Sequence, residues 1–130
     1  MTWRSFLLAG LSLPVLANPA LAHHSFSMFD RDKTVTITGT VKEYEFANPH
    51  GWIHMVATDS TGKQSEWSFE MQPISQLAPA GWKADTLKPG DKVAIDFHPL
   101  KDGARGGQFI TATLPNGKKL RDRAQAASEQ

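Results

Sequence analysis

A pattern of alternating residues begins in residues 34–46, which read TVTITGTVKEYEF. Val35, Ile37, Gly39 and Val41 fall at every second position, and threonines occupy most of the positions between them. This period of two, together with the many β-branched side chains, predicts a β-strand with one buried face. The stretch therefore indicates a β protein and supplies its first strand.

The apolar positions shift after Lys42, because Tyr44 and Phe46 fall in the opposite phase of the alternation. A shift of one residue moves side chains to the other face of a sheet, so it predicts a β-bulge or a short coil at this point. Residues 48–51, Asn-Pro-His-Gly, are typical of a turn and end the segment.

Further segments of the chain repeat the period of two. Pro73 and Gly81 fit the beginning and end of a short helix, and the pair Pro89-Gly90 fits a turn before another strand. After the first strand, the predicted elements are strands at 52–58 and 66–71 joined by a turn at 59–62, a helix at 73–78, a strand at 93–98, a flexible loop at 101–107 and a strand at 108–114.

The order of three strands, one short helix and two strands is typical of a five-stranded OB-like Greek-key barrel. In that fold the helix lies between strands three and four. Closure of the barrel also hides strand edges that a small open sheet would expose. A small β-sandwich is the alternative architecture, and both architectures are all-β.

The first 22 residues differ in composition from the rest of the chain. Arg4 gives a single positive charge before a mostly apolar stretch, and Ala20-Leu21-Ala22 places small residues where a signal peptidase cleaves. The apolar stretch is shorter than a transmembrane anchor requires and is interrupted by prolines. The predicted divisions are a signal peptide at 1–22, an N-terminal segment at 23–33, a β-barrel domain at 34–120 and a polar tail at 121–130.

Composition restricts the function classes. The 130 residues fit one small domain, and the net charge of +1 lacks the basic excess of a protein that binds nucleic acid. The absence of cysteine leaves no attachment point for a lipid and no disulfide. We expect a periplasmic or secreted protein with no nucleic-acid partner and no membrane attachment after signal cleavage.

Several short motifs carry a resemblance to a known family. They are His23-His24-Ser25-Phe26, Gly39-Thr40-Val41, Asn48-Pro49-His50 with Trp52, Trp67-Ser68-Phe69-Glu70, Gly81-Trp82, Leu87-Lys88-Pro89-Gly90-Asp91 and Leu114-Pro115-Asn116-Gly117. In combination they resemble a family of small exported bacterial proteins classified as a domain of unknown function. The resemblance implies export and a compact β domain, and it implies no established activity.

The histidines raise the question of copper. If cleavage follows Ala22, the α-amino group and the imidazole of His23 can chelate one ion, and nitrogen ligands of this kind suit Cu(II). A third nitrogen would complete the site, and the candidates are His24, His50, His54 and His98. His50 is the best of them, because its turn corresponds to a loop beside the ligand face of an OB barrel.

Each histidine also has an ordinary structural interpretation. The pair at His23 and His24 is a polar chain end if no metal binds there. His54 lies in a strand that is apolar on both faces, so it fits a half-exposed, hydrogen-bonded residue. His98 precedes Pro99 at a strand end and is expected to face outward.

Aromatic residues suggest a binding module. Trp52 and Trp82 lie next to turns and are candidate platforms for a ligand, with Asn48 as a polar neighbour. Trp67, Phe69 and Phe97 instead occupy the apolar phase of their strands and are predicted to be core. The partner that this interpretation allows is a small molecule, a glycan or a protein.

Catalytic signatures are weak in this sequence. Glu66 and Glu70 are separated by about 13 Å along a strand, which is more than paired glycosidase carboxylates allow, and they are predicted to lie on a solvated face. The leading prediction is a non-enzymatic binding or accessory module with an unidentified ligand. The alternative is a copper-binding protein that uses the His23 amine and imidazole with His50.

Overall fold

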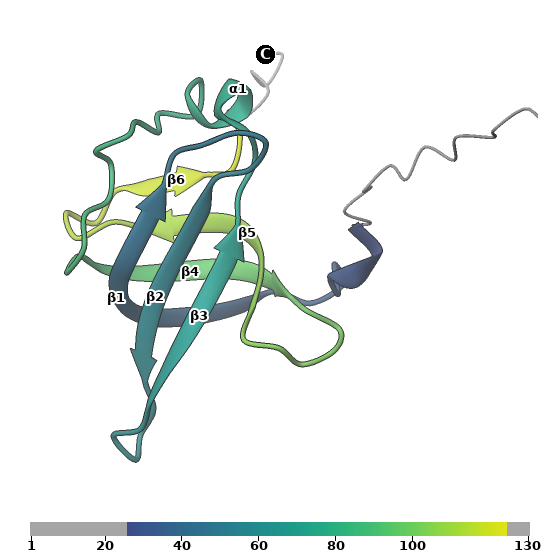
Figure 1. The fold of residues 1–130 in the computed structure, drawn as a ribbon, viewed down its shortest axis with the longest axis vertical. Helices are drawn as coiled ribbons and strands as arrows, with labels where there is room; N and C mark the ends of the chain where they lie inside the picture. Colours follow the sequence, from purple (N-terminus) through teal and green to yellow (C-terminus); the bar gives the residue numbers. More distant parts are fainter. Residues whose placement is uncertain (1–25, 125–130) are drawn as a thin grey trace, which may run out of the picture.

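The structure, a computed structural model, describes residues 26–124. Within that range one sheet and two short helices make up the regular structure (Figure 1). The elements are a 3-10 helix at Phe26–Met28, β1 at Val35–Glu45, β2 at Trp52–Thr58, β3 at Gln64–Glu70, α1 at Ile74–Leu77, β4 at Lys92–Pro99, β5 at Gly106–Thr113 and β6 at Lys119–Arg121.

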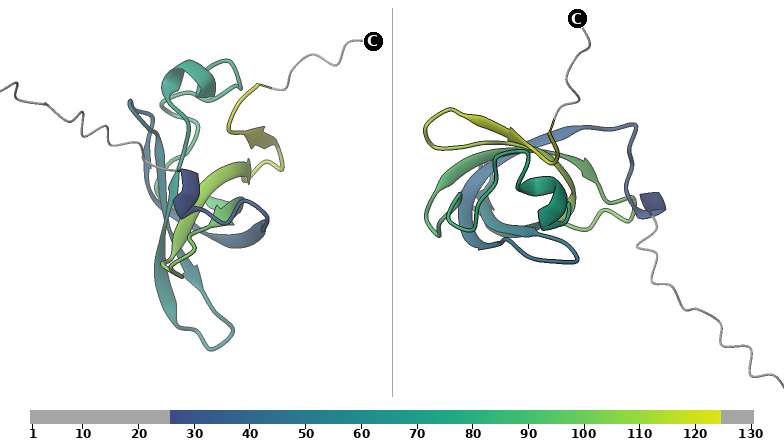
Figure 2. Two further views of the ribbon diagram at one scale, coloured as in Figure 1. Left: turned by 90° about the vertical axis from the view of Figure 1, so that its right-hand side faces the viewer. Right: turned by 90° about the horizontal axis from the view of Figure 1, so that it is seen from above.

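The sheet closes into a barrel. Its strands follow the order β3-β2-β1-β4-β5-β6, and β3 also pairs with β5 in parallel. This last pairing joins the two ends of the five-stranded sheet, which is the connectivity of an OB-like barrel. The predicted fold class is therefore confirmed, and the small β-sandwich is excluded. Viewed from above, the strands surround α1, which lies over one mouth of the barrel (Figure 2).

β1 bends through the predicted bulge. Its register with β2 shifts between Val41 and Glu43, where the apolar phase of the sequence also shifts. Gly39 lies in the tightest part of the strand, because a Cβ atom there would stand 2.5 Å from the carbonyl oxygen of Val56. Burial rises from Val35 to Val41, so Val35, which was expected on the buried face, is 40% exposed and Val41 is buried.

Two glycines allow the barrel to close. Gly106 and Gly107 were expected in a flexible loop, but both are buried and begin β5. A Cβ atom on Gly107 would stand 2.0 Å from the carbonyl oxygen of His98, and one on Gly106 would stand 2.1 Å from that of Ser68. Only residues without a side chain permit this approach of β5 to both neighbours.

The core fills the barrel and continues under α1. Its largest fully buried side chains include Phe69, Phe97, Phe109 and Trp82, and Leu77 of α1 is also fully buried. Trp67, predicted to be core, is partly buried against this cluster. The strand β6 was not predicted and extends the sheet beyond β5, where it places buried Leu120 on the core.

Hydrogen bonds between polar side chains join the strands β1, β4 and β5. Asp96 of β4 accepts hydrogen bonds from Thr36 of β1 and Thr111 of β5. Burial by itself raises the pKa of Asp96, but the two hydroxyl donors and the charge of Lys119 outweigh it, so the pKa is lowered. The carboxylate therefore stays charged and ties β4 to both neighbours.

Candidate functional site

A group of ionisable side chains lies on the outer face of β1, β2 and β3. The register pairs Glu43 with His54 and Glu45 with Trp52 across β1 and β2, and it pairs His54 with Ser68 across β2 and β3. Paired residues of neighbouring strands project to the same face of a sheet. The side chains of β1 that follow the bulge are thus brought beside those of β2.

Glu43, Glu45 and His54 form the tightest cluster of this face, which we call the outer triad. One ligand atom from each residue lies within 4.8 Å of the other two. Nε2 of His54 is 3.2 Å from a carboxylate oxygen of Glu45, and Nδ1 is 2.7 Å from the Ser68 hydroxyl. The ring of Trp52 stacks on the imidazole with an interplanar angle of 5°.

These contacts fix the orientation of the His54 ring. Because a carboxylate can only accept, Nε2–H donates to Glu45 and Nδ1 accepts from the Ser68 hydroxyl. If an ion takes the place of the Nε2 proton, Ser68 can instead accept a hydrogen bond from Nδ1–H, which leaves the Nε2 lone pair for the ion. Metal-binding histidines commonly have this arrangement, in which the nitrogen away from the ion is held by a hydrogen bond. The outer triad therefore presents one imidazole nitrogen and two carboxylates to a common point.

Lys42 of β1 is paired with Glu66 of β3. Lys42 donates a hydrogen bond of 2.6 Å to Glu66. This bond and the charge of Lys42 lower the pKa of Glu66, so the pair remains ionised at neutral pH. Within the outer triad the two carboxylates have His54 as their ionisable partner, and the charge of His54 also contributes to lowering the pKa of Glu66.

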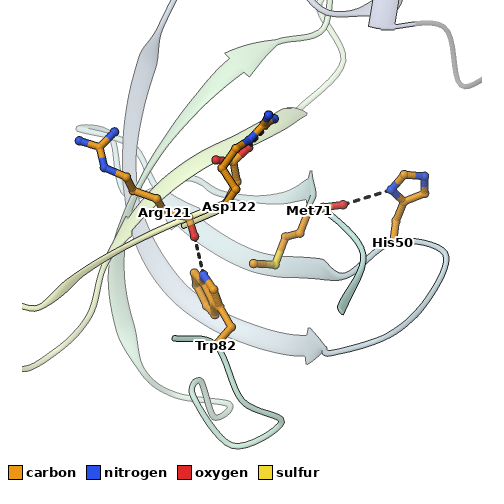
Figure 3. Close-up of polar contacts among 6 residues, drawn as sticks. His50, Met71, Trp82, Arg121 and Asp122 are labelled. Atoms are coloured by element: carbon orange, nitrogen blue, oxygen red, sulfur yellow. Dashed lines mark hydrogen bonds and ion pairs between the residues drawn. The ribbon is translucent and has the colours of Figure 1, made fainter. Parts of the chain in front are cut away.

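His50 occupies a different place, in the turn between β1 and β2. Its Nδ1 is 3.2 Å from the carbonyl oxygen of Met71 and 3.4 Å from a carboxylate oxygen of Glu70. Both neighbours are acceptors, so Nδ1 carries the proton and the lone pair of the neutral ring is on Nε2. Figure 3 shows Nδ1 directed at the Met71 carbonyl and the other nitrogen on the far side of the ring.

Glu70 differs from its prediction. It was expected on a solvated face with Glu66, but its side chain is only 11% exposed, whereas that of Glu66 is 69% exposed. The parallel pairing with β5 covers the end of β3 and buries Glu70 beside Gln108. Distance along one strand could not reveal this, because the cover comes from a strand almost forty residues later.

The predicted ligand platform is only partly assembled. Trp82 is 1% exposed and its Nε1 donates a hydrogen bond of 2.7 Å to the Arg121 carbonyl, so this ring belongs to the core (Figure 3). Asn48 is exposed, and its side chain accepts a hydrogen bond from the backbone of Ile74 at the start of α1. Trp52 remains half-buried on the outer face.

The other predicted metal ligands lie apart from one another. His98 is 2.7 Å from the Lys33 carbonyl oxygen through Nδ1, which fits its expected structural role. His54 belongs to the outer triad, while His50 belongs to the turn. His23 and His24, together with the predicted signal peptide, lie outside the described residues.

The sequence did not identify the two glutamates of the outer triad. Glu43 and Glu45 follow the bulge of β1 and are separated from His54 by a turn, so spacing alone does not place them together. The useful signal was the alternation of Glu43, Tyr44 and Glu45 after the bulge. With the register of the hairpin known, it places both carboxylates on the outer face.

Comparisons with known proteins identify a family. In residues 26–124 the structure has no helix that is long and apolar enough to span a membrane. Neither a curated protein nor a solved structure matches the chain. The model of the DUF6152 family, described as a family of unknown function, matches residues 12–109. This match covers most of the sequence, and the chain belongs to the DUF6152 family.

Proposed function

We propose that the protein is an exported, non-enzymatic binding module and that its outer triad binds a divalent first-row transition-metal ion. The single observation that carries this proposal is the convergence of Glu43, Glu45 and His54 within 4.8 Å. The export part rests on the cleavage motif at residues 20–22.

The chemistry of the donors supports a transition metal. One imidazole and two carboxylates suit Zn²⁺ and its neighbours, whose bonds to nitrogen and oxygen are about 2.0–2.2 Å long. Ligand atoms around one tetrahedral ion of this kind are about 3.4 Å apart. Glu43 is exposed and Glu45 is half-buried, so both can move their carboxylates inward by changing rotamer, and the ion relieves the repulsion between their charges.

Calorimetric titration with Zn²⁺ tests this site. His54→Ala should weaken Zn²⁺ binding at least about tenfold, since even loss of an outer hydrogen-bond partner of a metal ligand costs 10–100-fold. Ser68→Ala should weaken it less, because it removes only the group that orients the ring. The protein should remain folded in both variants, since His54 is on the surface of the sheet.

Glu66→Gln provides a matched control. Glu66 lies on the same face but is tied to Lys42, so this variant should bind Zn²⁺ as the parent does. Equal losses in Glu66→Gln and Glu45→Gln would indicate nonspecific attraction to negative charge. That result, or unchanged binding in His54→Ala, would overturn the assignment.

A second candidate function is copper binding by the processed chain end together with His50. The observation in its favour is that Phe29 and His50 line the same small cavity. Phe29 follows His23 by six positions, and because Phe26–Met28 form a 3-10 helix, this piece of chain spans at most about 16 Å. The orientation of His50, with Nδ1–H held by the Met71 carbonyl, also matches that of a metal ligand.

Cu(II) titration of the chain beginning at His23 tests this second candidate. One residue added before His23 should weaken binding, because it removes the chelate of amine and imidazole. Binding should strengthen from pH 5 to about pH 8 as these nitrogens lose protons. His50→Ala should change the Cu(II) electron paramagnetic resonance spectrum, and His98→Ala should not. Equal Cu(II) affinity in all four proteins would refute it.

A further inference from the structure

A small cavity lies where β3, β5 and the turn before β2 meet. It measures about 10 Å³, which is the space of one water-sized sphere. Its size excludes an organic ligand. The cavity is lined by Phe29, His50, Glu70, Met71, Gln72 and Gln108.

Gln108 carries an unpaired acceptor at this cavity. The residue is only 7% exposed, and no group in residues 26–124 gives a hydrogen bond to its Oε1 atom. Such buried and unsatisfied polar atoms are rare and costly in folded proteins. A hydrogen-bond donor or a cation inside the cavity would satisfy this oxygen.

Glu70 faces the same cavity from β3. It is the partner of Gln108 in the parallel ladder, and paired residues of neighbouring strands project to the same side. Its carboxylate is nearly buried, and one of its oxygens is 3.4 Å from Nδ1 of His50. A buried carboxylate and a buried amide oxygen together disfavour an anion and favour a positive occupant.

We propose that this cavity binds one divalent cation through oxygen ligands from Glu70 and Gln108, with His50 beside it. Oxygen ligands suit hard cations such as Mg²⁺, Ca²⁺ and Mn²⁺. The cation satisfies Gln108 Oε1 and compensates the buried charge of Glu70. This site is separate from the outer triad and does not depend on it.

Mn²⁺ binding, followed by electron paramagnetic resonance of the free ion, tests the cavity. The parent for this experiment carries Glu43→Gln, Glu45→Gln and His54→Ala, so that failure of the outer triad cannot affect the result. This parent should bind one Mn²⁺, and Ca²⁺ or Mg²⁺ should displace it. Glu70→Gln, which preserves the shape of the side chain, should weaken Mn²⁺ binding at least about tenfold.

Gln108→Glu distinguishes best between a cation and a water molecule in the cavity, because the two occupants predict different effects of Mn²⁺ on this variant. With a cation in the cavity, a second carboxylate should tighten Mn²⁺ binding about tenfold or more, and Mn²⁺ should raise the melting temperature of this variant. With only water in the cavity, two buried carboxylates repel each other and Mn²⁺ restores nothing.

Gln108→Leu serves as the control without a ligand oxygen. It should fold, since it replaces an unpaired polar atom by an apolar group of similar size, and it should lose Mn²⁺ binding. The proposal is overturned if the parent binds no Mn²⁺, or if Gln108→Leu and Glu70→Gln both bind it as the parent does. It is also overturned if Mn²⁺ leaves the melting temperature of Gln108→Glu unchanged.

Discussion

Gly107→Ala should destabilise the protein by about 3 kcal/mol or more, a large part of the stability of a small domain. The added methyl group would stand 2.0 Å from the His98 carbonyl oxygen and 2.7 Å from the ring of Phe97. The carbonyl belongs to the paired strand β4 and cannot yield without breaking the ladder. Urea unfolding followed by tryptophan fluorescence measures the loss.

Gly103→Ala is the matched control for this prediction. Gly103 lies in the neighbouring loop with a positive φ of 78°, and no atom lies within 4 Å of the position of an added Cβ. The cost is therefore the backbone strain alone, about 1–2 kcal/mol. Equal losses in the two variants would show that the close approach of β5 does not limit the fold.

Trp82→Ala should cost about 3–5 kcal/mol, the range observed when a buried aromatic side chain is truncated. The ring is 1% exposed, packs against Phe109 with centroids 5.5 Å apart, and donates a hydrogen bond to the Arg121 carbonyl at the end of β6. Trp82→Phe keeps most of the packing and should lose about 1–2 kcal/mol through the unpaired carbonyl. Thermal unfolding followed by circular dichroism compares the two variants.

Trp52→Ala removes a ring on the outer face and serves as the comparison for the buried ring of Trp82. Trp52 is half-buried on the outer face, where it stacks on His54, so its removal should cost well under half as much stability as Trp82→Ala. A larger loss in Trp52→Ala than in Trp82→Ala would contradict the assignment of Trp82 to the core.

The alternation of apolar and polar residues predicted most of the fold, because a strand with one buried face has apolar residues at every second position. The strand at Trp52–Thr58 has the predicted bounds, and the bulge lies where the apolar phase shifts. The short helix at Ile74–Leu77 lies inside its predicted range. The order of these elements was then enough to favour the barrel.

Contacts between distant strands could not be read in the same way. Glu70 and Gly107 owe their burial to the parallel pairing of β3 with β5, which no local pattern encodes. The short strand β6 has three residues and only one buried side chain, Leu120, so it carries no period. The sequence therefore did not predict the pairing of β3 with β5 that closes the barrel, or the strand β6 beside it.

The candidate site shows the same limit. His54 was recognised as a possible ligand from its residue type, but its glutamate neighbours come from β1 and depend on the register of a bulged pair. Gln108 was not singled out, because an amide becomes informative only when it is buried and without a partner. Both features are tertiary in origin.

Anomalous X-ray diffraction at the zinc edge, from crystals grown with Zn²⁺, tests the central claim most directly. The account predicts a peak on the outer face, about 2.0–2.2 Å from Nε2 of His54 and from one oxygen each of Glu43 and Glu45. A structure in which zinc binds elsewhere, while His54 Nε2 keeps only its contact with Glu45, would contradict it.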